Sequence, residues 1–127
     1  MNREQFIQYI SDEYGIDGEY LWASSPLSCA FRHPGNRKWF ALVMDVPKNK
    51  LGLAGSDALD VVNLKCDPIL VGSLRKEPGI FPAYHMNKAN WITVALDGSV
   101  PDELIKMLLD MSYDATVPKR KKKTKQS

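Results

Sequence analysis

The sequence predicts a single α+β domain, a two-layer sandwich with an antiparallel-rich sheet and helices on one face. Three observations lead to this prediction. The chain has 127 residues, the length of one domain. Apolar residues recur at helical spacing near both ends, and short strand-like apolar runs lie between them. In chain order the elements are a helix, three strands, a short helix, a strand and a helix, which favours such a sheet with its helices on one side.

The first helix is expected to begin after Asn2 and to end at Gly15. Asn2 is a plausible N-cap, and Gln5 occupies the third helical position, as a capping box requires. Glycine is common just after the end of a helix. Apolar residues fall on one face of this helix at Phe6, Ile7, Ile10 and Tyr14. The connection 16–26 follows, and its Tyr20, Leu21 and Trp22 are expected to pack over the core.

Three strands are predicted next, at 28–32, 37–46 and 61–66. The sequence His-Pro-Gly-Asn at 33–36 is a strong turn signal between the first two strands. The run WFALVM at 39–44 favours a central place in the sheet for the second strand, which Pro47 ends. Asp67 as an N-cap, with proline at the first helical position, then predicts a short helix over 67–76.

A fourth strand is predicted at 91–96, followed by a tight turn and a last helix. Ser99 or Val100 is expected to cap this helix, and Asp102 and Glu103 lie in its first turn, where acids suit the helix dipole. The expected core consists of large apolar residues from strands and helices: Trp39, Phe40, Leu42, Val62, Leu64, Trp91, Ile92, Val94, Ile105 and Leu108.

Charge divides the chain into a body, 1–117, and a basic tail, 118–127. The tail holds six cations and no acid, at Lys119, Arg120, Lys121, Lys122, Lys123 and Lys125. The body keeps eleven cations against fifteen acids, a net charge of −4. A block of like charges without apolar residues cannot bury surface, so the tail is expected to be disordered. It can screen phosphates of a polyanion or serve only as a solubilising terminus.

Several classes of protein are not expected from this sequence. The amino terminus lacks the pattern of a signal peptide, and no apolar run is long enough for a membrane helix. Cys29 and Cys66 are expected as buried, reduced thiols of a cytoplasmic protein. Metal-ligand, phosphate-loop and nucleophile motifs are missing, so neither a metal, a cofactor nor an enzymatic activity is predicted.

A polar cluster, Tyr84, His85, Asn87 and Lys88, precedes the fourth predicted strand. It supplies donors and acceptors but no neighbouring carboxylate, which disfavours acid–base catalysis. Two other roles stay open. The His85 ring and Asn87 can hydrogen-bond backbone in an irregular segment that lacks strand pairing, or the cluster can recognise a ligand.

Basic residues gather in two loops. The turn between the first two strands offers Arg32, His33, Asn36, Arg37 and Lys38. Lys48 and Lys50 follow the second strand, and Lys88 with its flanking asparagines could form another contact. Lysine and arginine at hairpin tips can serve solubility alone. They also suit phosphate contacts, which position a nucleic acid without reading its sequence.

Three motifs, PGIFPAYHMNKANWITVALDG from Pro78, KWFALVM from Lys38 and NLKCDP from Asn63, occur in order. Together they resemble the signature of the MmcQ/YjbR family of small bacterial proteins, from about Phe6 to Tyr113. The resemblance implies a fold like that of frataxin-like CyaY and a DNA-binding role described as a double wing, for which the 33–38 turn is the best match.

The sequence thus predicts a non-enzymatic, monomeric, cytoplasmic protein that binds duplex DNA. Its contacts would be Arg32, Arg37, Lys38, Lys48, Lys50, Lys88 and the cations of the tail. The alternative is a small ligand-binding or protein-interaction domain that uses the cluster from Tyr84 to Asn90. An acid-free face shared by Arg32, Arg37, Lys38 and Lys88 would favour DNA, whereas scattered cations would favour the alternative.

Overall fold

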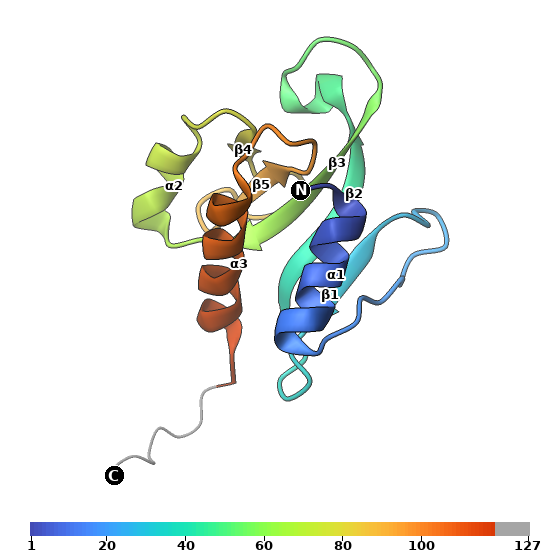
Figure 1. Cartoon of the computed structure of the whole chain (residues 1–127). Helices are drawn as coiled ribbons and strands as arrows, with labels where there is room; N and C mark the ends of the chain where they lie inside the picture. The colour runs from blue at the N-terminus through green and yellow to red at the C-terminus, as the bar shows by residue number, and fades with distance from the viewer. Residues whose placement is uncertain (119–127) are drawn as a thin grey trace.

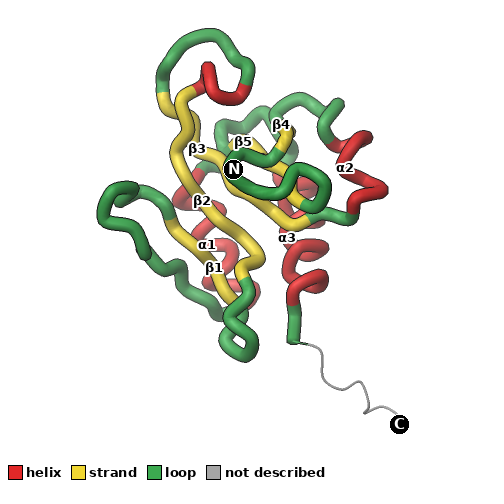
Figure 2. Tube along the Cα trace, turned by 180° about the vertical axis from the view of Figure 1, so that it is seen from behind, coloured by secondary structure: helices red, strands yellow, loops and turns green. Residues whose placement is uncertain are grey.

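The computed structural model describes residues 1–118, which form one antiparallel sheet with its long helices on one side. The order of its five strands is β1-β2-β3-β5-β4. The elements are α1 (Arg3–Tyr14), β1 (Cys29–Arg32), β2 (Trp39–Pro47), the 3-10 helix η1 (Lys48–Leu51), β3 (Ala58–Lys65), α2 (Pro68–Leu74), β4 (Ile80–Pro82), β5 (Trp91–Ala95) and α3 (Asp102–Thr116). Helices α1 and α3 lie in front of the sheet in Figure 1 and behind it in Figure 2. The α+β two-layer prediction is therefore confirmed.

Two of the three predicted helix starts are confirmed. The Asn2 side chain accepts from the backbone N–H of Gln5 at 2.8 Å, and the Gln5 side chain accepts from that of Asn2 at 2.9 Å. Asp67 accepts from the N–H of Ile69 at 2.9 Å. The capping predicted for α3 is wrong, because Pro101 precedes the helix without a side-chain cap and Ser99 instead bonds Asp97 in the preceding turn.

Strand β4 and the 3-10 helix η1 are the elements that the sequence did not predict. Strand β4 is the one that extends the sheet. It pairs with β5, so that Ile80 lies opposite Val94 and Pro82 opposite Ile92. Its three residues are too few for a periodic signal. It is an edge strand, where a proline without an N–H is tolerated. Strand β3 also begins three residues earlier than expected, at Ala58.

The expected single core is divided between the two faces of the sheet. On the helix side, α1 and α3 bury Phe6, Ile10, Ile105, Leu108 and Leu109 against β-strand residues that include Val62, Leu64, Ile92 and Val94. Leu42 belongs to a separate apolar cluster, against which Trp39 and Trp22 are packed. Tyr20 and Leu21 are exposed, so the prediction that they cover the core is wrong and holds for Trp22 alone among the three. Trp91, opposite Lys65 on β3, lies on that second face too, and both Trp39 and Trp91 are only half-buried. Successive side chains of a strand alternate between faces, so the predicted list mixed two surfaces.

Both cysteines are free and buried, as predicted, and belong to the helix-side core. Burial raises the pKa of both thiols above the usual thiol range. None of the helices between residues 1 and 118 is long and apolar enough to traverse a bilayer. The basic tail lies beyond the described residues, apart from Pro118 at its start.

Candidate nucleic-acid interface

The face of the sheet opposite α1 and α3, here called the helix-free face, is covered only in part, by loops. Its central strand residues are Trp39, Leu42 and Met44 of β2, Val61, Asn63 and Lys65 of β3, and Trp91, Thr93 and Ala95 of β5. The acids within the described strands are Asp45 and Asp60. These two are cross-strand partners, and Asp60 lies 3.3 Å from the guanidinium of Arg3 on α1. Both acids therefore belong to the helix side.

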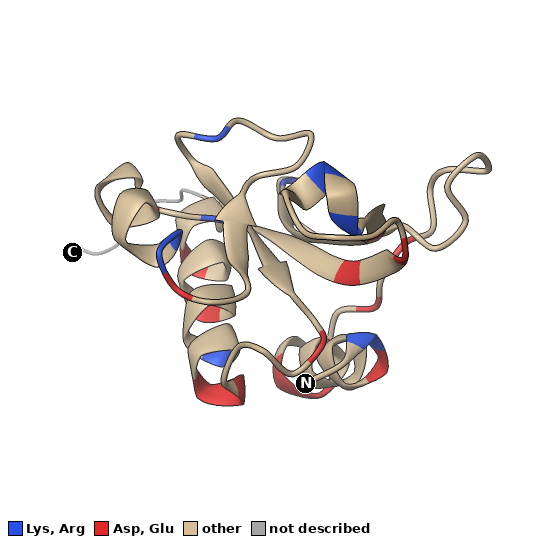
Figure 3. Cartoon of the chain, turned by 90° about the horizontal axis from the view of Figure 1, so that it is seen from above, with Lys and Arg blue, Asp and Glu red and all other residues tan. Residues whose placement is uncertain are grey.

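The two sides of the sheet differ in charge. Helices α1 and α3 together carry seven acidic and two basic residues. In Figure 3, Asp and Glu segments mark both long helices on the lower side, while Lys and Arg mark η1 and a loop on the upper side. The net charge of −4 is thus concentrated on the helix layer. A negative body does not exclude a polyanion from the other side, because exposed charges beyond about 10 Å are screened at ordinary salt.

A buried polar group lies at the centre of the helix-free face. Thr93 donates to the Asn63 side chain at 2.5 Å, and Asn63 donates to the backbone carbonyl of Tyr84 at 2.8 Å. The N–H of Tyr84 donates in turn to the Thr93 oxygen at 2.8 Å. These bonds dock the irregular segment 83–90 onto the sheet. Sequence reasoning missed both residues, although an asparagine inside an apolar strand was the available signal.

His33 is not one of the exposed cations of the 33–38 turn. Its side chain is only 2% exposed, and its Nε2 lies 2.9 Å from Thr116 Oγ1 and 3.1 Å from the Tyr113 carbonyl. Burial lowers its pKa below the usual value for histidine. The prediction that His33 adds positive charge to this turn is therefore wrong, because the ring is packed under α3 as a neutral hydrogen-bonding group.

Asn36 holds the same turn in place. Its amide donates to the Thr116 carbonyl at 3.0 Å, and its oxygen accepts from the backbone N–H of Lys38 at 3.0 Å. Arg37 adopts a left-handed conformation with φ 64°. The turn is thus tied to the end of α3, so Arg37 and Lys38 project from a fixed backbone.

Two arginines of the predicted contact set lie beside an acid. The Arg32 side chain donates to both oxygens of Glu19, and this hydrogen bonding holds the pKa of Glu19 below its usual range. Arg37 lies 3.8 Å from the same carboxylate and is 59% exposed. Arg32 is therefore largely neutralised, while Arg37 keeps most of its surface free.

Lys38 is exposed and Lys65 is half-exposed. Neither forms an ion pair with another described residue. They line a cleft of about 400 Å³ together with Arg37, Trp39, Trp91 and Thr116. This cationic cleft lies at the β1–β2 turn end of the helix-free face. Lys65 was not singled out from the sequence, because only the pairing of β3 with β5 places it opposite Trp91.

Lys50 and Lys88 form a second basic group. Both line a cleft of about 280 Å³ that also includes Leu51, Phe81 and Tyr84. This cleft shares no lining residue with the cationic cleft. The structure therefore brings Lys50 and Lys88 together although they are far apart in sequence, but it separates them from Arg37 and Lys38. Because Glu19 also lies beside Arg32 and Arg37, the four predicted cations do not share one acid-free patch, and by this criterion their arrangement favours the ligand-binding alternative. Lys48 stands at the start of η1 and is half-buried.

The predicted cluster of Tyr84, His85, Asn87 and Lys88 does not converge on one site. His85 is exposed, has φ 61°, and makes no side-chain hydrogen bond to the described residues. Its ring instead lies 3.9 Å from the Tyr84 ring, centroid to centroid. The hydrogen-bonding role expected for its ring is therefore wrong. Asn87 does bond backbone, accepting from the N–H of Ala89 at 2.8 Å.

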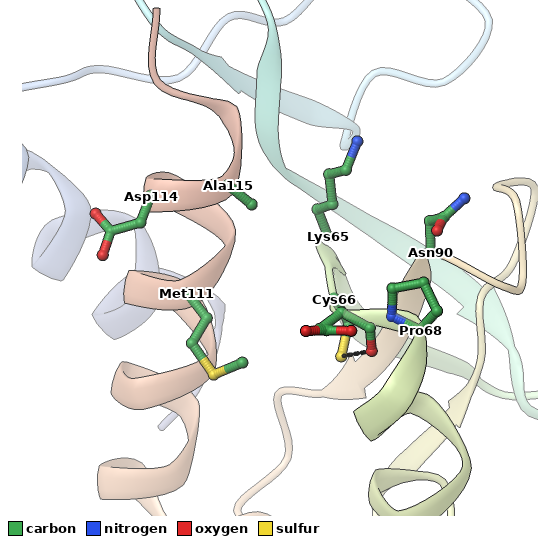
Figure 4. A pocket seen from close by; sticks show the side chains of 8 residues that line it. Lys65, Cys66, Pro68, Asn90, Met111, Asp114 and Ala115 are labelled. Carbon is green, nitrogen blue, oxygen red and sulfur yellow. Dashed lines mark hydrogen bonds between the residues drawn. The ribbon is translucent and has the colours of Figure 1, made fainter. Parts of the chain in front are cut away.

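A further cleft, of about 450 Å³, lies between α3 and the end of β3 (Figure 4). Its Cys66 thiol donates to the Asp67 carbonyl at 3.5 Å, while the Asp114 carboxylate across the cleft points away from it. The raised pKa keeps this thiol protonated, which is the inert form. The described residues also contain no group of three His, Cys, Asp or Glu side chains placed to hold a metal ion.

Fold and surface together define a small α+β domain with an acidic helix layer and a basic, aromatic sheet face. The model of the YjbR family matches residues 14–115, and the chain belongs to that family. It is 36% identical to the uncharacterized protein YyaQ of Bacillus subtilis over 91% of this chain and 98% of that protein. It is 46% identical to YjbR of Escherichia coli over 49% of this chain and 56% of that protein.

A solved structure from Pseudomonas syringae is similar throughout. Its TM-score is 0.90 at 48% sequence identity, covering 92% of this chain and all of that one. The resemblance to MmcQ/YjbR proteins and the α+β class are thus confirmed. The comparison with frataxin-like CyaY stays a prediction.

Proposed function

We propose that this protein is a non-enzymatic DNA-binding module that works as a monomer without a cofactor. The observation that carries the proposal is the helix-free face, whose strands present no carboxylate and whose two ends carry exposed cations. The contacts are Arg37, Lys38 and Lys65 in the cationic cleft and Lys50 and Lys88 in the second basic group. Cations fixed at two ends of one face suit phosphates of one duplex, and such contacts set position rather than sequence preference.

The turn 33–38 is the best candidate for a wing. Hydrogen bonds to Thr116 fix its backbone, which lowers the entropy cost when its cations meet phosphates. Arg32, within its ion pair, supports the turn rather than DNA. The cations of the tail from Lys119 onward, which follow α3 in the chain, add further phosphate contacts.

The test is a titration of duplex DNA at several salt concentrations. Reversing both charges in Arg37→Glu/Lys38→Glu should weaken binding at low salt. It should also reduce the slope of log affinity against log salt by about 0.9 for each phosphate that the variant no longer neutralises. The matched control is Arg75→Glu/Lys76→Glu, because these exposed residues after α2 line neither basic cleft. Equal weakening by both double variants would reject the face as the binding surface.

One observation favours the alternative of a small-ligand site. His85 from the predicted cluster lines an apolar cleft with Trp22 and Trp39, apart from Lys88. A ligand there would be gripped by aromatic rings rather than by the donors of the cluster. Binding that does not depend on Arg37 and Lys38 would support this alternative.

A further inference from the structure

The helix-free face carries two adjoining clefts of different chemistry. One is the cationic cleft of Arg37, Lys38 and Lys65. The other, here called the tryptophan cleft, has a volume of about 280 Å³ and is lined by residues that include Trp22, Ser25, Trp39, Met44, His85 and Met86. Trp39 lines both clefts, so the two adjoin at this residue.

The tryptophan cleft suits a flat, uncharged ring. The Trp22 and Trp39 rings lie 5.6 Å apart, centroid to centroid, with an interplanar angle of 85°. A planar ligand stacked on one indole therefore meets the other edge-on, and both arrangements are favourable for aromatic groups. The volume lies just under the roughly 300 Å³ at which drug-sized sites begin, which fits one small ring system.

The electrostatics of the cleft point to the same ligand. The lining contains no carboxylate that could pair with a cationic ligand. The serine pair at its wall, Ser25 and Ser28, lies with the two hydroxyl oxygens 2.8 Å apart. These hydroxyls can exchange hydrogen bonds with polar ring edges. Beyond Trp39 the surface becomes cationic, so an anionic group attached to the ring would meet Lys38 and Lys65.

We propose that the tryptophan cleft holds an unpaired nucleobase while the adjoining cationic cleft holds its phosphate. The inference rests on the proposed function and adds to it a site for single-stranded or locally opened nucleic acid. Base–aromatic stacking tolerates all bases, so the site adds affinity without strong sequence preference. The same chemistry is available from a free nucleotide, which the experiment separates from a strand.

The experiment measures tryptophan fluorescence while the full chain is titrated with four ligands at one salt concentration. These are a short oligothymidylate, the same oligonucleotide with abasic sites in place of its bases, thymidine monophosphate and a duplex. Oligothymidylate should bind roughly 5- to 150-fold more tightly than the abasic strand, the value of stacking one base. Binding of the mononucleotide as tight as that of the strand supports the site and assigns it to free nucleotides.

Two variants assign the preference to the cleft. Trp22→Leu should remove the preference for oligothymidylate over the abasic strand while leaving abasic binding unchanged, because Trp22 lines only the tryptophan cleft. Lys65→Gln should weaken both ligands equally. The matched control, Trp91→Leu, should keep the preference, since Trp91 lines only the cationic cleft. Should Trp22→Leu fail to fold, Trp22→Phe, with a smaller ring, should give an intermediate preference.

Equal affinity for oligothymidylate and the abasic strand overturns the inference, as does a preference that survives Trp22→Leu. The duplex titration separates failure of the nucleobase site from failure of the proposed duplex binding. If the protein binds the duplex but shows no preference for oligothymidylate over the abasic strand, the nucleobase site is overturned and the proposed duplex binding stands. Base-dependent binding of oligothymidylate without duplex binding overturns the duplex proposal and supports the site.

Discussion

The two faces of the sheet share the same strands but are closed in different ways. On one face, α1 and α3 supply long apolar surfaces that bury the strand residues almost completely. On the other, loops and the segment 83–90 cover a smaller apolar cluster and leave clefts between them. Helices close a sheet because their side chains form a regular stripe, whereas the polar backbone of loops must be satisfied by specific hydrogen bonds. The clefts lined by Arg37, Lys38, Lys50 and Lys88 lie on the loop-covered face.

The two faces should differ most in how much stability is lost when a buried leucine is truncated to alanine and leaves a cavity. Leu108→Ala on α3 should lower the free energy of unfolding by about 2–5 kcal/mol, because the leucine is 2% exposed between helix and sheet. Leu42→Ala on the helix-free face should cost less, because covering loops can relax into the space. Urea unfolding measures both. An equal or larger loss at Leu42 would show that the loops pack as rigidly as the helices.

The second prediction tests how the segment 83–90 is held. Asn63→Ala should lower the free energy of unfolding by about 1–3 kcal/mol, because it leaves Thr93 and the Tyr84 carbonyl without their partner. Hydrogen exchange should show faster exchange of the Tyr84 amide.

Ser112→Ala is the matched control for that change. Ser112 is a buried polar residue on the helix side, where it donates to the Phe40 carbonyl at 2.5 Å. It should destabilise the protein without changing exchange at Tyr84. Unaltered exchange at Tyr84 in the Asn63 variant would mean that other contacts dock the segment.

The third prediction concerns pH. The folded-state pKa of His33 is lowered by burial, so the unfolded chain binds this proton more readily. The stability contributed by neutral, buried His33 should be fully present above about pH 6.5, the pKa of histidine in the unfolded chain. It should decline as the pH falls below that value toward the lower folded-state pKa. Urea unfolding between about pH 7.5 and about pH 5.5 tests this, since most carboxylates titrate lower. His33→Gln should flatten this part of the profile, and an unchanged slope would contradict the assignment.

The smallest effect is expected at His85 on the helix-free face. His85→Asn should change the free energy of unfolding by no more than about 0.5 kcal/mol, because the ring is exposed and asparagine tolerates its left-handed backbone. A thermal melt measures this. A loss above about 1 kcal/mol would mean that contact with the Tyr84 ring stabilises the segment.

Local signals in the sequence were sufficient for several features. The Asn2 and Asp67 caps, the end of α1 at Gly15 and the buried thiols follow from residue types at fixed spacings. Strand β4 does not follow from such signals, because a strand of three residues that includes Pro82 is too short to show a period. The candidate site was predicted only in part, since Lys38 and Lys88 are exposed as expected but lie in separate clefts.

By itself, the sequence determined the α+β class, both ends of α1, the start of α2 and the charge contrast between body and tail, because these depend on neighbouring residues. Only the tertiary structure decided which face each strand side chain occupies, that His33 is buried, and that Glu19 neutralises Arg32. It also placed Trp22 beside Trp39, and Lys65 beside Trp91. These outcomes depend on strand register and on contacts between residues distant in the chain, which no local pattern specifies.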